Sequence, residues 1–164
     1  MSDDGPYLLC YDGSEDARHA ITEAGKLFGG GEALVAYAWR PPSAFSIPGK
    51  LIGDDHPLAV AASEFDASAA EEAERIVAEG AEIAREAGFD ATSVADKCGR
   101  QWTALAKLAD DRNARAVVVG SRGGSQIREA VLGSVSSGLV NHSTRPVLVI
   151  THPRRRPSGE EPSG

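Results

Sequence analysis

The 164-residue chain has little sulfur and no long apolar segment. Its two cysteines, Cys10 and Cys98, form no C-x-x-C pair, which argues against a structural zinc site or a disulfide framework and favours a reducing compartment. No apolar run approaches the roughly 20 residues that a membrane-spanning helix needs. The first residues carry neither a basic segment nor an apolar run, so we expect no signal peptide, no membrane partner and a cytoplasmic protein.

Positive charge is also scarce. The chain has 17 lysines and arginines against 24 aspartates and glutamates, which gives a formal net charge of −7. An acidic surface repels nucleic acid, and the sequence has no basic stripe with interleaved aromatic residues, so we expect no nucleic-acid partner. The same charge repels a nucleotide at long range. Any phosphate site must therefore be built locally, from backbone N–H groups, a helix N-terminus and one or two basic side chains.

Three common motifs for nucleotide or hydrolase chemistry are missing. The sequence has no GxxxxGK[ST], which argues against a P-loop NTPase. No GxGxxG follows the first apolar segment, which disfavours the usual dinucleotide-binding fold. The absence of a G-x-S-x-G elbow leaves a hydrolase of that type without a nucleophile.

What the sequence does contain is a regular alternation of apolar segments and amphipathic patterns. Tyr7 to Tyr11 predicts a strand buried on both faces, and a helix beginning near Ser14 has the three-and-four apolar spacing of one buried face. Further strands are predicted at 33–39, 91–96, 116–119 and 146–150, and further helices at about 63–87, 102–112 and 134–142. This order predicts an α/β fold in which a five-stranded parallel sheet is sandwiched by helices, a Rossmann-like three-layer architecture.

Two segments interrupt the alternation. Residues 40–62 are rich in proline and glycine, and we interpret them as one long loop with room for a single helical turn. Residues 153–164 mix an arginine run with glutamate, proline and glycine, and this composition predicts a disordered tail. We therefore expect one domain over residues 1–152.

The glycines after the fourth predicted strand form the most informative pattern. In sheets of this kind, ligands bind beyond the carboxyl ends of the strands, where the strand order reverses. Gly120, Gly123 and Gly133-Ser134 follow the fourth strand with the spacing G-x2-G-x9-G-S. Glycine allows close approach to an anion because it has no Cβ. The N–H groups at the start of the following helix would point at the same place, where Arg122 would add a charge-assisted bond.

This arrangement resembles the universal stress protein family from Tyr7 to Ile150. The resemblance rests on the opening strand followed by Asp12, on the segments 119–123 and 132–136, and on the closing segment 145–150. It implies an adenine nucleotide alpha hydrolase-like fold and a signalling or stress-response protein that binds ATP. The bound ATP would carry Mg²⁺ or Mn²⁺ on its phosphates, and no metal ligand would come directly from the protein.

The resemblance also implies roles for individual residues. Asp12 corresponds to the ribose ligand, Ala38 and Val119 flank the adenine, and the glycine loop with the following helix start contacts the phosphates. Ala38 is smaller than the usual aliphatic residue, and Gln101 stands where many members carry proline or a small residue. The predicted ATP-binding set is Asp12, Gly13, Ala38, Val119, Gly120, Arg122, Gly123, Gly133, Ser134, Val135 and Ser136.

Simpler interpretations stay open for each of these residues. The glycines are also consistent with plain turns, Asp12 with a turn former, Ser134 with a helix cap and Arg122 with a solvated side chain. At the level of function, the alternatives are a nucleotide-independent protein-interaction module that uses the 40–62 loop, and a very slow ATPase. We expect no enzyme, because no convincing general base lies near the phosphate loop.

The last predicted strand is expected to lie at an edge of the sheet, and apolar edge strands are usually covered or paired. The family resemblance implies that two such edges pair antiparallel in a homodimer. The residues of this predicted dimer edge are Val147, Leu148, Val149 and Ile150.

Overall fold

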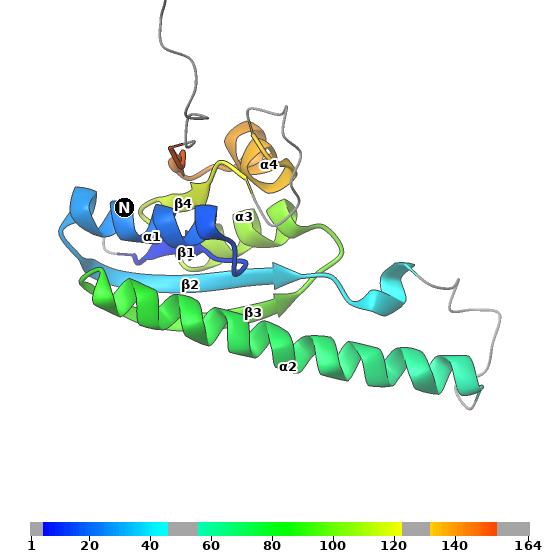
Figure 1. The fold of residues 1–164 in the computed structure, drawn as a ribbon. Helices are drawn as coiled ribbons and strands as arrows, with labels where there is room; N and C mark the ends of the chain where they lie inside the picture. Colours follow the sequence, from blue (N-terminus) through cyan, green and yellow to red (C-terminus); the bar gives the residue numbers. More distant parts are fainter. Residues whose placement is uncertain (1–4, 46–55, 123–131, 154–164) are drawn as a thin grey trace, which may run out of the picture.

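The computed structural model describes residues 5–45, 56–122 and 132–153. Helices and strands alternate along the chain, as Figure 1 shows. In chain order the elements are β1 (Tyr7–Cys10), α1 (Glu15–Phe28), β2 (Gly31–Trp39), the 3-10 helix η1 (Pro42–Phe45), α2 (Pro57–Glu86), β3 (Phe89–Lys97), α3 (Gln101–Asp111), β4 (Val117–Gly120), α4 (Ser134–His142) and β5 (Val147–Ile150).

The strands form one parallel sheet in the order β3-β2-β1-β4-β5. The chain runs outward from β1 to β3, then returns to β4 on the other side of β1, so the strand order reverses between β1 and β4. The predicted fold class is confirmed. The predicted elements differ from the observed ones mainly at their ends; β2 and β3, for example, each extend beyond the predicted ranges.

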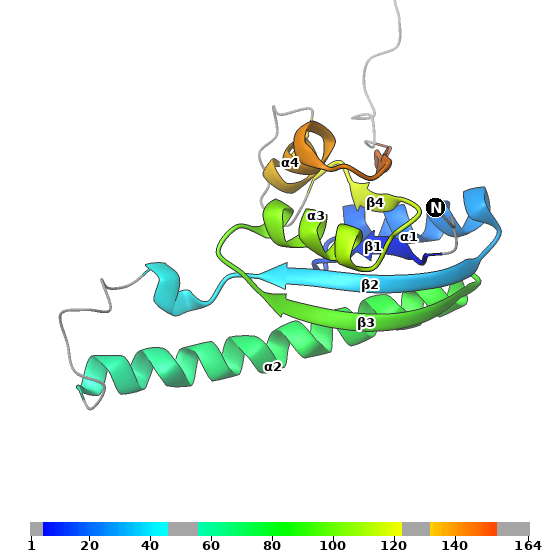
Figure 2. The ribbon, with the colours of Figure 1, turned by 180° about the vertical axis from the view of Figure 1, so that it is seen from behind.

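Helices cover both faces of the sheet, α1 and α2 on one face and α3 and α4 on the other (Figures 1 and 2). The side chains of neighbouring β1 residues lie on opposite faces of the sheet. Leu9 packs against α1 and α2, whereas Leu8 packs against α3 and α4. Both side chains are fully buried. A strand covered on both faces therefore has an unbroken apolar sequence, which is why the first segment shows no alternation.

Local capping signals in the sequence set the bounds of α1. Ser14 is its N-cap, with Oγ accepting a hydrogen bond from the N–H of Ala17 at 3.2 Å. Gly29 ends the helix in the left-handed conformation at φ 71°. These two residues fix where the helix leaves β1 and where it returns to β2.

The prediction of one long loop over residues 40–62 is wrong for part of that range. Residues 42–45 form η1, which is the single helical turn that the prediction allowed, but α2 already begins at Pro57. Proline is favourable at the first helical position, where its missing N–H would have no partner. His56 caps the helix, because its Nδ1 accepts from the N–H of Leu58 at 3.2 Å. Pro57 thus starts a helix where we expected it to prevent one.

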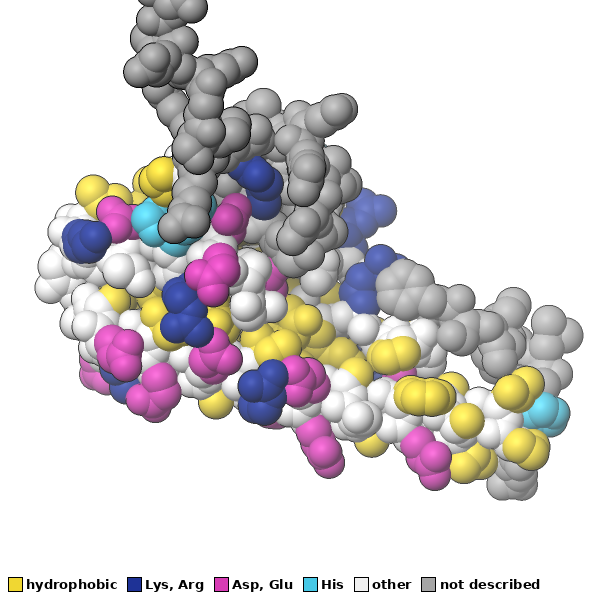
Figure 3. All heavy atoms as spheres, in the orientation of Figure 1, with side chains coloured by type: hydrophobic (Ala, Val, Ile, Leu, Met, Phe, Trp, Pro, Cys, Tyr) yellow, Lys and Arg dark blue, Asp and Glu magenta, His cyan; other side chains and the backbone are white. Residues whose placement is uncertain are grey.

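Because α2 begins so early, its first turns extend past the end of the sheet (Figure 1). Asp66 ties this part of the helix to η1 by accepting hydrogen bonds from the N–H of Ser43 at 3.0 Å and from its hydroxyl at 2.7 Å. Leu58 and Phe65 remain 56% and 66% exposed. Figure 3 shows hydrophobic side chains gathered at this end of the molecule.

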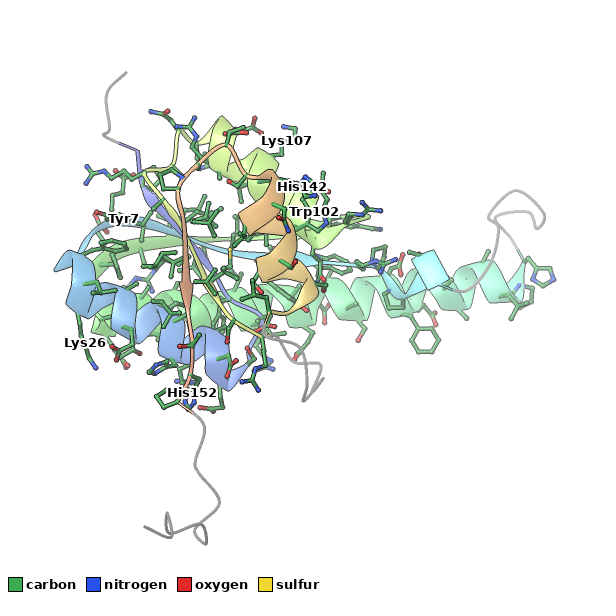
Figure 4. All side chains as sticks on the ribbon, turned by 90° about the horizontal axis from the view of Figure 1, so that it is seen from above. Tyr7, Lys26, Trp102, Lys107, His142 and His152 are labelled. Atoms are coloured by element: carbon green, nitrogen blue, oxygen red, sulfur yellow. The ribbon has the colours of Figure 1, made fainter. Side chains whose placement is uncertain are left out.

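On the opposite face of the sheet, α3 and α4 pack closely. Trp102 of α3 and His142 of α4 lie side by side (Figure 4), with ring centroids 4.5 Å apart and nearly parallel planes. Gly138 makes this approach possible, because a Cβ there would lie 2.2 Å from Cγ of Trp102. The start of α4 is thereby held at a fixed place above the sheet.

Some predictions cannot be compared with the structure. The predicted tail residues 154–164, and Gly123 of the glycine pattern, lie outside the described residues. Within the described ranges, no helix is long and apolar enough to cross a membrane.

A test of the packing on the α2 face is the variant Gly80→Ala. A Cβ at Gly80 would lie 2.5 Å from the ring of Tyr11 and 2.9 Å from Val35. Helix propensity alone would make the Gly80→Ala protein more stable than the wild type by about 1 kcal/mol. We expect the reverse, a free energy of unfolding lower by about 1–3 kcal/mol, because the added methyl group overpacks the core. Urea unfolding followed by circular dichroism measures it.

The control is Ala78→Gly, at an exposed position of the same helix, which calibrates the propensity effect in this chain. A Gly80→Ala protein more stable than the wild type would contradict the close packing of Tyr11 against α2.

Candidate functional site

A cavity of about 340 Å³ opens at the carboxyl ends of the strands, where the strand order reverses. This volume lies at the lower end of the range for small-molecule sites. Of the predicted ATP-binding residues that the structure describes, all except Gly13 line it. The structure thus brings together Asp12, Ala38, Val119, Gly120, Arg122, Gly133, Ser134, Val135 and Ser136.

The start of α4 supplies one end of the cavity. Gly133 is the N-cap, and Ser137 makes the first backbone hydrogen bond of the helix, donating its N–H to Gly133 O at 2.9 Å. Ser134, Val135 and Ser136 precede this bond, so their N–H groups have no acceptor within the helix. They point toward the helix N-terminus, where the macrodipole places partial positive charge.

Two residues of this segment are occupied by internal bonds that brace it. The N–H of Gly133 donates to Ser121 O at 2.7 Å. The Ser136 hydroxyl lies 3.0 Å from Ser121 O and 3.1 Å from Gly133 O, and Ser136 is only 2% exposed. Gly133 therefore offers no N–H to a ligand, and Ser136 offers its main chain but not its side chain. Both residues fix the helix start against the end of β4.

Arg122 follows β4 and is the one basic residue among the described residues that line the cavity. Its Nε is shielded from solvent and has no hydrogen-bond partner among the described residues. A buried donor without an acceptor is unfavourable in a protein interior. An anionic ligand in the cavity would supply the acceptor.

Asp12 forms a turn and also lines the cavity. Its Oδ1 accepts from the N–H of Ser14 at 3.0 Å, which makes it a turn former. The same residue lines the cavity. Gly13 lies next to it at φ 84°, a left-handed conformation that favours glycine, but it does not line the cavity. Gly13 shapes the turn that presents Asp12.

Gly120 has a packing role that the sequence did not reveal. A Cβ there would lie 2.9 Å from the backbone oxygen of Asp16, in the first turn of α1. The absence of a side chain lets the end of β4 lie directly against α1. This contact brings the two loops that line the cavity, after β1 and after β4, close together.

Where the sheet and α3 line the cavity the residues are mostly apolar, and this part is its apolar end. Ala38 and Val119 are 3% and 6% exposed. Burial, with a smaller contribution from the charge of Asp12, raises the pKa of the Cys10 thiol to about 12, so this thiol stays protonated and unreactive at neutral pH. The lining residues that sequence reasoning missed are Cys10, Tyr11, Ala17, Ala36, Tyr37, Gln101 and Leu105.

For two of these residues, the sequence contains a feature that could have placed them at the cavity. Ala36 is two residues before Ala38 on β2, so period-two alternation places both on one face. Gln101 departs from the family pattern at the start of α3, and its Nε2 donates to Ala38 O at 3.0 Å.

Tyr11 connects the cavity with α2. Its hydroxyl donates to Glu79 Oε1 at 2.6 Å, and Arg18 of α1 pairs with the same oxygen at 2.6 Å. Burial and then the hydrogen bond to Glu79 raise the pKa of Tyr11 above its ordinary value. The phenol is therefore a fixed donor at neutral pH, and it holds the residue before Asp12 in place.

The fold is that of an α/β protein with a cavity at the reversal point of a parallel sheet, the place where such folds bind ligands. The family model of the universal stress protein family matches residues 6–151. The chain belongs to the universal stress protein family.

Individual relatives agree with this assignment. Universal stress protein MJ0577 of Methanocaldococcus jannaschii is 35% identical over 46 residues, which is 28% of this chain and 28% of that protein. The solved structure of MJ0577 matches at a TM-score of 0.75 with 20% identity, covering 94% of this chain and 100% of that one. Identity this low shows the fold alone.

Two further structures contain nucleotides. A universal stress protein in complex with cAMP matches at a TM-score of 0.61 with 25% identity, covering 92% of this chain and 98% of that one. The universal stress protein from Archaeoglobus fulgidus in complex with dAMP matches at a TM-score of 0.52 with 19% identity, covering 88% of this chain and 96% of that one. The latter likeness again shows the fold alone.

The bracing role of Ser136 gives a stability prediction. Ser136→Ala removes the hydroxyl bonded to the buried carbonyl of Ser121, and we expect the free energy of unfolding to fall by about 1 kcal/mol. The control Ser134→Ala changes an exposed side chain two residues earlier in the same helix and should have a smaller effect. Urea unfolding of both variants compares them. Equal stability losses would show that the Ser136 hydroxyl does not brace the loop.

Proposed function

We propose that this protein binds ATP in the cavity between β1 and β4 and acts as a signalling or stress-response protein. One observation carries the proposal: the start of α4 and Arg122, whose Nε is buried without a hydrogen-bond partner among the described residues, line the same cavity as several apolar residues. A nucleotide needs both kinds of lining, because it has charged phosphates at one end and a flat apolar base at the other.

The phosphates would lie against Ser134, Val135 and Ser136. Three main-chain N–H groups without an acceptor in their own helix can bind an anion at its N-terminus, and Arg122 would add a charged donor there. These groups are local, so they can act on a protein whose formal net charge is −7. Gly123 of the predicted motif would also belong to this end.

The ribose and base would occupy the rest of the cavity. Asp12 is the carboxylate that lines it, and a carboxylate accepts hydrogen bonds from ribose hydroxyls. Ala38 and Val119 would flank the adenine. The universal stress protein that was solved with cAMP, at 25% identity to this chain, supports an adenine nucleotide as the ligand.

A divalent cation, Mg²⁺ or Mn²⁺, would accompany ATP through the phosphate oxygens, which are the hard ligands these ions prefer. Residues 5–45, 56–122 and 132–153 contain no group of three or more His, Cys, Asp or Glu side chains that would hold a metal ion. The absence of direct protein ligands stays a prediction.

We further propose that the bound ATP is a signal and is not turned over rapidly. Among the described residues that line the cavity, Asp12 is the one carboxylate and there is no histidine. General-base catalysis needs such a group within hydrogen-bond reach of the attacking water. A slow ATPase is the alternative, and it would appear as steady phosphate release that Asp12→Ala alters. Cytoplasmic location also stays a prediction.

The variant Gly133→Val tests the phosphate site. Gly133 has φ −71°, which valine can adopt, so the protein should fold while the branched side chain obstructs the start of α4. We expect ATP affinity to fall by at least tenfold in calorimetric titration. In the wild type, ATP at a hundredfold excess over Kd should add about 2.7 kcal/mol of stability.

The matched control is Val140→Ala, which shortens an exposed side chain of the same helix and should leave ATP affinity unchanged. Circular dichroism confirms that both variants fold. Wild-type affinity in a folded Gly133→Val protein would remove the role assigned to this loop.

We also propose that the protein forms a homodimer by antiparallel pairing of two β5 strands. β5 lies at an edge of the sheet, as predicted, and Val147, Leu148 and Val149 are only partly buried. Pro146 O and Ile150 O accept hydrogen bonds from Val117 and Ser121 on the β4 side. Main-chain groups alternate along a strand, so those of Val147 and Val149 face the open edge.

The variant Val149→Pro removes an N–H from this open edge without removing a hydrogen bond to β4. We expect it to convert the dimer to a monomer in sedimentation velocity, and Val149→Lys should do the same by placing a charge on the edge. A wild-type protein that is monomeric at tens of micromolar would contradict the proposed dimer.

A second candidate function, nucleotide-independent protein interaction, is favoured by one observation. Leu58, Val60 and Phe65 are large apolar side chains on the projecting part of α2, and each is about half exposed or more. Exposed apolar clusters often mark interaction surfaces. This function predicts no thermal shift with ATP, which separates it from the first.

A further inference from the structure

The carbonyl of Ala38 occupies a special position at the apolar end of the cavity. Ala36 O accepts from the N–H of Tyr11 at 3.0 Å, on the β1 side, whereas Trp39 O accepts from Cys98 on the β3 side. Because main-chain groups alternate along a strand, Ala38 O faces the β1 side again. β1 ends at Cys10, so no strand residue lies opposite this carbonyl, and it faces the cavity.

Gln101 fills this position. It is the first residue of α3, and its Nε2 donates to Ala38 O at 3.0 Å, bridging the start of α3 and the end of β2. Gln101 also lines the cavity. A carboxamide has two N–H donors and an oxygen acceptor in one plane. With one N–H held by Ala38, the acceptor Oε1 is fixed beside the cavity.

The other lining residues at this end do not offer a comparable group. Ala36, Leu105 and Val119 are apolar, and the Cys10 thiol stays protonated. Tyr37 packs its side chain on the opposite face of the sheet, with the α1 and α2 cluster, whereas Ala36 and Ala38 belong to the α3 and α4 cluster. Gln101 is thus the hydrogen-bonding side chain that a base in this end would meet.

We propose that Gln101 determines the base specificity of the site by accepting a hydrogen bond from the 6-amino group of a purine. The inference rests on the proposed function and deepens it. Gln101 takes the main-chain acceptor Ala38 O out of use and presents a side-chain acceptor in its place. A 6-oxo purine would set its own acceptor against Oε1, and that unpaired contact is unfavourable.

The test compares ATP with ITP, which carry the same phosphates and ribose but differ at the 6-position of the base. The ratio of their dissociation constants therefore reports the base contact and cancels effects on the phosphate site. We expect the wild type to bind ATP about tenfold more tightly than ITP, the effect of one buried hydrogen bond made or left unmade. Calorimetric titration measures both.

One variant of the same position sharpens the comparison. Gln101→Lys offers only donors, so ITP should bind more tightly than ATP. The control Thr103→Val changes an exposed residue of α3 and should keep the wild-type ratio.

Each outcome has a distinct meaning. Wild-type protein that binds ATP and ITP equally well, or a Gln101→Lys protein that keeps the full preference for ATP, overturns the role of Gln101 while the proposed function stands. Wild-type protein that binds neither nucleotide overturns the proposed function itself, and the role of Gln101 with it.

Discussion

The N–H groups at the start of α4, which have no acceptor within their own helix, are the feature on which the rest of the site depends. An acidic chain cannot attract a nucleotide by its overall field, so anion binding has to come from dipoles and donors within a few ångströms. The structure fixes these donors with two internal bonds to Ser121 O, one from the main chain of Gly133 and one from the hydroxyl of Ser136. The bracing residues keep the remaining amides turned outward.

The surrounding fold serves this arrangement through close backbone contacts. Gly120 lets β4 end against the first turn of α1, and Gly138 lets α4 lie against Trp102 of α3. On the other face, Gly80 leaves room for Tyr11, whose hydroxyl reaches Glu79 of α2. Elements far apart in the sequence therefore hold the loops after β1 and β4 at fixed positions around the cavity.

Much of the fold followed from short-range signals in the sequence. The apolar strand segments, the Ser14 cap and the Gly29 stop each depend on neighbouring residues, and the structure confirms them. Pro57 was misinterpreted because proline both starts and breaks helices, and the choice depends on the cap at His56. Gly120 and Gly138 were beyond prediction in detail, because their reason is contact with distant backbone or a distant ring.

In the candidate site, too, features that depend on neighbouring residues could be predicted, and features that depend on distant contacts could not. Residues that follow the strands directly, such as Asp12 and Arg122, could be placed at the cavity because parallel strands end at one edge of a sheet. The hydrogen bond between Gln101 and Ala38 joins residues 63 positions apart, and no local pattern predicts such a bond. The bracing role of Ser136 was likewise hidden, since the family pattern suggests only a phosphate contact.

The most direct test of the central claim is a titration of the ¹⁵N-labelled protein with ATP and Mg²⁺, observed by amide NMR. The account predicts saturable shifts of the Ser134, Val135 and Ser136 amide resonances, together with the Nε–H signal of Arg122, because phosphate oxygens accept from those groups. Resonances of Val140 on the same helix should stay in place. ATP binding that leaves the three amides unmoved, or no binding at all, would contradict the account.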